Sequence, residues 1–431
     1  MILVDTALER RAREGNPIRV ALSGAGYMGR GIALQMVRAV PGVDLVAIAS
    51  RDPGQADAAF AAAGRPDARL VSTDDELADA MAAGRPAVTS DADLLAHAAG
   101  VEAVIEATGD VEAGARFALG SIESGKHVVL VNAELDGTLG PLLKARADRA
   151  GVVVSYTDGD EPGLIVNLSR YARAIGLEPV LVGNLKGLLD PYRTPETQRA
   201  FAASVGQKER MVTSFADGTK LSLEATITAN ALGFGVACRG MTGHRCEHVN
   251  EAAGLFDAEE LLRGGIVDFL LGAQPGSGAF VVAYGDDPDR QNYLSYFKLG
   301  DGPLYTFYQP WHLPNFDVPL TVARAVLFHD AAVTPLGPPR CEVVTIAKRE
   351  LPEGTLLDGF GGFDSYGTIE NADVARSANL LPMGLAEGCR LMRAVEIDEP
   401  ITLDDVERPS SRLVDELWNE QLELFFGPGE R

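Results

Sequence analysis

GAGYMGRGIALQM, residues 24–36, decides the fold because it places three glycines between an apolar strand and an apolar helix. The preceding run IRVALS is rich in β-formers and is typical of a buried parallel strand. From Met28 onward, apolar residues recur at helical spacing until a Pro-Gly pair ends them, and a second strand-like run follows at 43–50. This order predicts a βαβ unit with glycines at its first turn.

Each glycine has its own role in a dinucleotide-binding turn. Gly24 permits the tight turn, Gly26 lets the backbone approach a pyrophosphate, and Gly29 lets the helix pack on the strand. Tyr27 and Met28 begin the helix, whose free N–H groups attract an anion. We therefore expect a nicotinamide dinucleotide here, with glycines that serve only a turn as the alternative.

The end of the second strand favours NADP(H) over NAD(H). Proteins that bind NAD usually place Asp or Glu about 20 residues beyond the glycines. Ser50 holds that position and Arg51 follows it, a pair suited to a 2′-phosphate, while the nearby Asp52 keeps NAD open. We also expect cofactor contacts at the ends of two later apolar runs, from Thr108, Gly109 and Asn132.

Composition excludes several classes of partner. The chain has 38 Lys plus Arg against 61 Asp plus Glu, a formal charge of -23 at pH 7, which repels nucleic acid. No apolar run reaches the roughly 18 residues of a membrane span, so no membrane partner is expected. The four cysteines form no CxxC pair, and the N-terminus has charges where a signal peptide needs an apolar stretch. The expected location is cytoplasmic.

The length of 431 residues predicts several domains in an α/β chain. Alternating strands and helices predict a Rossmann domain with a doubly wound parallel sheet at 1–156, in which 66–100 insert two short helices. We expect a central α+β catalytic and oligomerisation domain at 157–335, a small β-rich domain at 336–408 and a C-terminal helix at 409–431.

The aromatic segment at 293–316 is expected to pair as two strands around a turn at Gly300–Pro303. Its aromatic side chains offer an apolar patch for association, so a homo-oligomer is expected. Lining of the core or of a substrate pocket is the alternative.

Three stretches of the central domain concentrate groups suited to hydride-transfer chemistry. Lysine polarises a carbonyl or takes a proton from an alcohol, and carboxylates orient a substrate or hold a metal. The stretches are TDGDEPG at 157–163, GNLKG at 183–187 and FADGTKLSLEATITAN at 215–230. In the last, Asp217, Lys220 and Glu224 have helical spacing and are expected on one face. A surface ion pair between Lys220 and Glu224, with Asp217 as a helix N-cap, is the alternative.

The chain resembles the homoserine dehydrogenase-like oxidoreductases that carry a C-terminal SAF domain. The strings that carry this resemblance are SGAGYMGRGI, VIEATG, GKHVVLVNAELD, GDEPGLI, GNLKG, DGTKLSLE, YQPWHL, AKRELPEGTLLDGFGG and LLPMGLAEGCRLMRAVEIDEPITLDDVE. The strings VN-x-E-x-D, GD-x-P and DGTK are shared with the branch that includes 1-deoxy-D-xylulose 5-phosphate reductoisomerase-like enzymes. Homoserine dehydrogenase proper normally has a catalytic lysine shortly after the strand that here ends VNAEL, and this chain has Glu134 in that neighbourhood instead, which disfavours simple homoserine oxidation.

The resemblance implies hydride transfer, either alone or coupled to isomerisation, on a small polyhydroxylated substrate such as a sugar phosphate or sugar acid. It implies that Lys186 and Lys220 bind or polarise substrate oxygens. It gives the orienting carboxylates as Asp217, Glu224, Glu134 and Asp160, of which Glu134, Asp160 and Glu224 are candidate ligands for Mg or Mn. Homoserine dehydrogenase itself, and a non-catalytic NADP-sensing carbohydrate-binding protein, are the alternatives.

Overall fold

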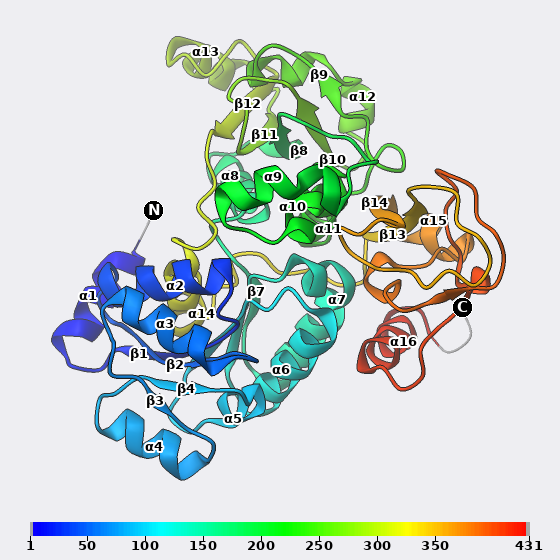
Figure 1. Cartoon of the computed structure of the whole chain (residues 1–431). Helices are drawn as coiled ribbons and strands as arrows, with labels where there is room; N and C mark the ends of the chain where they lie inside the picture. The colour runs from blue at the N-terminus through cyan, green and yellow to red at the C-terminus, as the bar shows by residue number, and fades with distance from the viewer. Residues whose placement is uncertain (1–2, 428–431) are drawn as a thin grey trace. The chain divides into compact units, whose positions relative to one another are not determined.

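The computed structural model describes residues 3–427, which divide into two compact units (Figure 1). The first unit comprises 3–159, Leu313–Thr334 and Arg412–Leu424. The second comprises Asp160–His312, Pro335–Ser411 and 425–427. Each unit therefore collects segments far apart in the sequence. The bounds of the four segments expected from the sequence stay predictions.

The first unit is built on a seven-stranded sheet in which every neighbouring pair is parallel, which confirms the predicted Rossmann-like fold. The strands in sheet order are β3 (Arg69–Leu70), β4 (Ala87–Thr89), β2 (Val43–Ala49), β1 (Ile18–Ser23), β5 (Ala103–Glu106), β6 (His127–Leu130) and β7 (Val154–Tyr156). Its helices are α1 (Val4–Arg13), α2 (Tyr27–Arg38), α3 (Pro53–Ala63), α4 (Asp74–Ala82), α5 (Ala92–His97), α6 (Val111–Glu123), α7 (Ala133–Ala150), α14 (Val318–Phe328) and most of α16 (Leu413–Phe426).

The segment 66–100 forms the two expected helices, α4 and α5, but it is not only an insertion. It also supplies β3 and β4, which extend the sheet beyond β2. These strands have two and three residues, too few for a period-2 pattern to identify them in the sequence.

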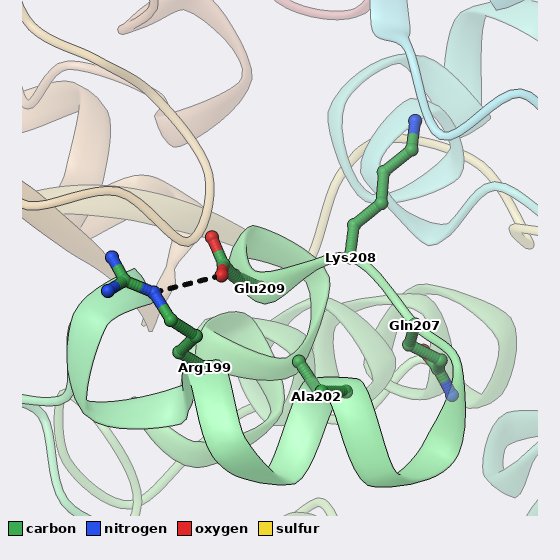
Figure 2. A pocket seen from close by; sticks show the side chains of 6 residues that line it. Arg199, Ala202, Gln207, Lys208 and Glu209 are labelled. Carbon is green, nitrogen blue, oxygen red and sulfur yellow. Dashed lines mark hydrogen bonds and ion pairs between the residues drawn. The ribbon is translucent and has the colours of Figure 1, made fainter.

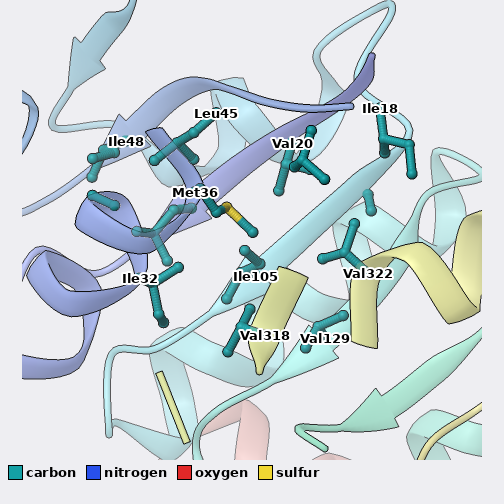
Figure 3. Packing of buried hydrophobic residues seen from close by; sticks show 14 of the residues in the cluster. Ile18, Val20, Ile32, Met36, Leu45, Ile48, Ile105, Val129, Val318 and Val322 are labelled. Atoms are coloured by element: carbon teal, nitrogen blue, oxygen red, sulfur yellow. The ribbon is translucent and has the colours of Figure 1, made fainter. Parts of the chain in front are cut away.

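The core of the first unit lies between the sheet and helices from distant parts of the chain. Ile32 and Met36 of α2 pack against apolar residues of β1 and β2, and Val318 and Val322 of α14 belong to the same cluster (Figure 3). Complete burial of such side chains stabilises the fold by about 1.5–3 kcal/mol each. Residues 313–334 are thus structurally part of the Rossmann unit.

The second unit contains a five-stranded mixed sheet with the order β12 (Leu304–Gln309), β11 (Ala279–Tyr284), β8 (Glu178–Lys186), β10 (Ile266–Leu271) and β9 (His244–Arg245). Its helices are α8 (Glu161–Ala174), α9 (Pro195–Val205), α10 (Glu209–Ala216), α11 (Thr219–Leu232), α12 (Ala258–Leu261), α13 (Pro288–Tyr296) and the 3-10 helix η1 (Val249–Gly254). Helix α8 packs on β8, β11 and α11, and this contact positions the residues of the candidate site.

The expected pair of strands at 293–316 is wrong. Residues up to Tyr296 belong to α13, and β12 pairs antiparallel with β11. Asp287 caps α13 by accepting hydrogen bonds from the backbone N–H groups of Asp289 and Arg290, and Pro288 favours the first helical turn. This start signal directs the aromatic residues that follow into a helix.

The remaining part of the second unit is rich in short strands. Two antiparallel pairs are formed by β13 (Cys341–Ala347) with β14 (Ser365–Asn371) and by β15 (Arg390–Leu391) with β16 (Val406–Glu407). The helical elements are α15 (Ala372–Ser377), η2 (Met383–Leu385) and η3 (Leu403–Asp405). The assignment of this segment as a SAF domain stays a prediction. Within residues 3–427, no helix has the length and apolar character needed to cross a membrane.

The structure explains the glycines at positions 24 and 29 of the turn between β1 and α2 by the lack of space for a side chain. Gly24 has φ +110°, and an added Cβ would lie 2.5 Å from the carbonyl oxygen of Ala107. A Cβ on Gly29 would lie 2.0 Å from the carbonyl oxygen of Gly24. A Cβ on Gly26 would meet no atom within 4 Å. Gly24 and Gly29 thus serve close packing, whereas Gly26 leaves space above the turn.

We predict that Gly29→Ala destabilises the protein by about 1–3 kcal/mol, because its methyl group overlaps backbone atoms that cannot move independently. Gly26→Ala serves as the control and should stay within about 0.5 kcal/mol of the parent protein. Urea unfolding followed by circular dichroism measures both. Equal stability of the two variants would contradict the packing role of Gly29.

Candidate active site

The turn that was predicted to bind a dinucleotide lies at the carboxyl end of β1. Gly26 is the N-cap of α2, and no side chain caps the first N–H groups of this helix. Free N–H groups at a helix N-terminus, together with the open space at Gly26, are suited to a pyrophosphate. The next two residues of the helix are Tyr27, which is exposed, and Met28.

The residues after β2 bear on the choice between NAD and NADP. The Asp52 carboxylate caps α3 by accepting a hydrogen bond from the Gly54 backbone N–H at 2.9 Å. Arg51 is exposed, and no ion pair joins it to an acidic residue in the described part of the chain. Ser50 is half-buried. The carboxylate nearest this turn is thus used in capping, while the guanidinium is accessible.

The ends of β5 and β6 are joined by polar contacts. Glu106 is completely buried, which raises its pKa to about 7, and it accepts hydrogen bonds from the backbone N–H (2.9 Å) and the hydroxyl of Thr108. Asn132 caps α7 by accepting from Leu135 N–H at 3.1 Å. Gly109 has φ +69°. Thr108 and Asn132 therefore have structural partners besides any ligand. Glu134 lies buried on α7 of this same unit.

Five charged residues of the second unit form what we call the lysine cluster: Asp160, Glu161, Lys186, Lys220 and Glu224. The ammonium of Lys220 lies 3.2 Å from Asp160 Oδ2 and 3.3 Å from Glu224 Oε1. The ammonium of Lys186 lies 3.6 Å from Glu224 Oε2 and 3.6 Å from Glu161 Oε1. The structure thus brings together four of the six catalytic candidates, and Glu224 joins the two lysines.

Three secondary-structure elements position this cluster. Asp160 is the N-cap of α8, and Glu161 is the first residue of that helix. Lys186 ends β8, while Lys220 and Glu224 are one turn apart on α11. Because α8 packs on both β8 and α11, the three elements present these residues to one another.

Asn184 fixes the central carboxylate of the cluster. It precedes Lys186 by two residues on β8, and alternate residues of a strand point to the same face. Its Nδ2 donates a hydrogen bond to Glu224 Oε2 at 2.8 Å, and its Oδ1 is buried without a hydrogen-bond partner. Asn184 was not among the sequence candidates, because a single amide in an apolar strand carries no pattern.

The lysines of the cluster are more accessible than the carboxylates. The side chains of Lys186 and Lys220 are 19% and 15% exposed, against 8%, 4% and 3% for Asp160, Glu161 and Glu224. Burial and then the charge of Glu224 raise the pKa of Glu161 well above its usual range. Burial alone would lower the pKa of Lys186, but Glu224 and Glu161 outweigh it, so the pKa of Lys186 is raised. Glu224 therefore favours both the charged form of Lys186 and, together with burial, the acid form of Glu161.

His312 lies beside the cluster. Its Nδ1 is 3.7 Å from Glu161 Oε1 and 3.5 Å from Ser277 Oγ, and its side chain is 35% exposed. Glu161 belongs to the stretch TDGDEPG that was expected to concentrate functional carboxylates, but it was given no role of its own, and His312 was not a candidate. Glu161 directly follows the candidate Asp160, so a predicted helix start at Gly159-Asp160 could have identified it. His312 lies in the YQPWHL string, far from Glu161 in the sequence.

The carboxylates do not fit a divalent cation well. Ligand atoms of Asp160, Glu161 and His312 lie within 4.8 Å of one another. However, each carboxylate of the lysine cluster has an ammonium within 3.6 Å, and Mg²⁺ or Mn²⁺ would compete with that charge. A raised pKa also disfavours Glu161 as an anionic ligand.

Asp217 does not share the face of Lys220 and Glu224. It precedes α11 at the end of α10, and its buried carboxylate lies 2.9 Å from the ammonium of Lys348. It also accepts a hydrogen bond from Thr219 N–H at 2.9 Å. Lys348 further donates to the carbonyl oxygens of Arg193 (2.8 Å) and Gly362 (2.9 Å). The expectation from helical spacing failed because Gly218, with φ +91°, separates the two helices.

A hollow on the surface of the second unit is separate from these residues. It has a volume of about 360 Å³ and is lined by α9, α10 and the segment between them (Figure 2). Arg199 and Glu209 pair across it at 3.2 Å, and Lys208 extends from its edge. No residue of the lysine cluster lines it.

Two family models match the chain, one to each of these sites. Residues 24–156 match the NAD-binding domain of homoserine dehydrogenase, and residues 159–318 match the catalytic domain of the oxidoreductase DRL. Over these two regions the chain is similar to homoserine dehydrogenase-like NAD(P) oxidoreductases. The second match contains the whole lysine cluster and His312. The comparison with curated protein sequences found no match to this chain.

Solved structures with weak similarity are also oxidoreductases. An NAD-binding oxidoreductase from Klebsiella pneumoniae is 19% identical over 40% of this chain and only 43% of its own, with a TM-score of 0.28. A homoserine dehydrogenase from Thiobacillus denitrificans is 16% identical over 73% and 74%, with a TM-score of 0.40. A myo-inositol dehydrogenase from Corynebacterium glutamicum is 12% identical over 73% and 90%, with a TM-score of 0.41.

We predict that Asp217→Ala lowers the free energy of unfolding by about 3–5 kcal/mol, because Lys348 is left buried without its counter-charge. The matched control is Arg199→Ala, which breaks an exposed ion pair and should cost less than about 1 kcal/mol. Urea unfolding measures both. A loss at Asp217 no larger than the control would show that this pair does not hold the second unit together.

Proposed function

We propose that this oxidoreductase transfers a hydride between NADP(H) and a carbinol or carbonyl carbon of a small polyhydroxylated, sugar-derived substrate. The observation that carries the proposal is the lysine cluster, in which buried carboxylates hold the ammonium groups of two partly exposed lysine side chains. Donors fixed in this way stabilise the negative charge that develops on a carbonyl oxygen during reduction.

The residues of the cluster have separate roles in this proposal. Lys186 and Lys220 donate hydrogen bonds to substrate oxygens, and one of the two protonates the alkoxide oxygen when a carbonyl is reduced. Asp160 and Glu224 hold the ammonium groups in place, and Asn184 holds Glu224. Bound NADP(H) supplies or accepts the hydride. Two neighbouring donors and several acceptors are suited to adjacent hydroxyl and carbonyl oxygens of a polyol derivative.

The preference for NADP is supported by the end of β2. The Arg51 guanidinium is exposed, whereas the Asp52 carboxylate is engaged with the N-terminus of α3. A free guanidinium favours a 2′-phosphate, and a carboxylate in capping is less available to a ribose 2′-hydroxyl. Isomerisation coupled to hydride transfer, homo-oligomer formation and a sugar phosphate or sugar acid as the particular substrate stay predictions.

We expect Lys220→Ala to lower kcat by about 10²–10⁴-fold, because the substrate oxygen loses a positioned donor. The rate is measured with NADPH or NADP against a panel of polyols, sugar acids and sugar phosphates, with Lys208→Ala as a matched control on an exposed lysine. Binding of NADPH should be unchanged in both variants. Turnover by Lys220→Ala at the parent rate would favour a non-catalytic, NADP-sensing protein or a reaction elsewhere.

We expect Arg51→Ala to weaken NADPH binding about tenfold, since a charge-assisted hydrogen bond to the 2′-phosphate is lost, and to leave NADH binding unchanged. Fluorescence titration of each dinucleotide gives the two dissociation constants, and Arg10→Ala on α1 controls for net charge. Parallel losses for NADPH and NADH would remove the basis for the NADP preference. Oxidation of L-homoserine at a useful rate would instead support homoserine dehydrogenase.

A further inference from the structure

We propose that His312 and Glu161 conduct protons between solvent and Lys186 during turnover. This inference rests on the proposed function, because it takes Lys186 as the group that gives a proton to the substrate oxygen. It adds two residues to the reaction that would not themselves bind the substrate. It also assigns a role to the buried carboxylic acid that substrate orientation leaves unused.

The geometry of the path is a short series of contacts. Glu161 Oε1 lies 3.7 Å from His312 Nδ1 on one side and 3.6 Å from Lys186 Nζ on the other. A small rotation of either neighbour brings it within hydrogen-bond distance of this oxygen. The other oxygen of Glu161, Oε2, is buried without a hydrogen-bond partner. Glu161 also has a side-chain hydrogen bond with Asp160, and its contacts with His312 and Lys186 are those through which a proton can pass to and from solvent.

The exposed fraction of the side chains falls from His312 to Glu161 and rises again at Lys186. The side chain of His312 is 35% exposed, that of Glu161 is 4% exposed and that of Lys186 is 19% exposed. A substrate that covers the Lys186 ammonium closes its direct access to water. Protons then reach Lys186 through Glu161, and His312 is the member of the path that remains in contact with solvent.

The surrounding charges allow Glu161 to change its protonation state. Asp160 and Glu224 favour the acid form, while Lys186 favours the carboxylate. His312 faces the same Oε1 oxygen of Glu161 as Lys186, and Lys220 contributes to the same cluster through its contacts with Asp160 and Glu224. When Lys186 has taken the proton of Glu161 and is positive again, burial and the charges of Glu224 and Asp160 still raise the pKa of Glu161, so the acid is re-formed by a proton from His312.

The proton balance closes for reduction of a carbonyl. Hydride from NADPH forms the new C–H bond, and the carbonyl oxygen takes a proton from the Lys186 ammonium. The Lys186 amine then takes the proton of the Glu161 carboxyl group, Glu161 takes one from the His312 imidazolium, and His312 takes one from water. The sum is NADPH, carbonyl and H⁺ giving NADP⁺ and alcohol. Oxidation runs through the same groups in reverse.

The test uses His312→Ala and Glu161→Gln in the full-length protein, with a substrate identified by the panel above. We expect kcat to fall about tenfold or more in each, with unchanged KM and unchanged NADPH binding. Added imidazole should restore kcat in His312→Ala, because it enters the space left by the side chain, but not in Glu161→Gln. His97→Gln, an exposed histidine on α5, is the control and should keep the parent rate.

Three results would overturn the proton path. They are a parent-like kcat in His312→Ala, a loss of kcat that imidazole does not restore, and an effect confined to KM. Circular dichroism and NADPH titration of each variant identify a folding defect. If His312→Ala is misfolded, the imidazole test is repeated with His312→Gln, which changes the volume of the side chain less. Failure of the proposed function is separate: the parent protein itself would then turn over no member of the panel.

Discussion

The burial of three carboxylates at the junction of α8, β8 and α11 is the constraint on which the candidate site depends. Removal of several negative charges from water costs several kcal/mol per group unless cations or protons compensate. Two lysines and the raised pKa of Glu161 provide this compensation. The ion pairs that compensate the buried carboxylates also hold the two ammonium groups in place. The same contacts therefore stabilise the fold and orient the donors.

The dinucleotide turn obeys a steric constraint instead. Gly29 must lie against the carbonyl oxygen of Gly24, whereas Gly26 faces open space. Close packing sets the path of the chain, and the absence of a side chain at the N-cap leaves the helix N–H groups accessible. A compact strand-to-helix connection and an anion-binding surface therefore result from the same three residues, without any charged side chain.

Local patterns in the sequence were sufficient for most of the Rossmann unit and for part of the site. The strands and helices with clear periodicity were predicted. The sequence also indicated four site residues that the structure brings together, namely Asp160, Lys186, Lys220 and Glu224. The features that the sequence did not predict depend on partners distant in the sequence or on strands of two or three residues. Lys348 pairs with Asp217 from 131 residues away, and β3 has only two residues. His312 joins Glu161 through tertiary packing that no local pattern records.

The cost of the lysine cluster is itself an argument about its role. Buried ion pairs often contribute little net stability, and apolar side chains of similar volume can replace them without loss of fold. The Asp217–Lys348 pair is nearly inaccessible and bonded on all sides, as expected of a structural contact. The lysine cluster differs, since the side chains of its lysines are partly exposed, its lysine–carboxylate distances extend to 3.6 Å and one carboxyl oxygen has no hydrogen-bond partner. Cations that are restrained yet partly accessible can donate to a further oxygen, which is the property required of a site that stabilises a developing alkoxide.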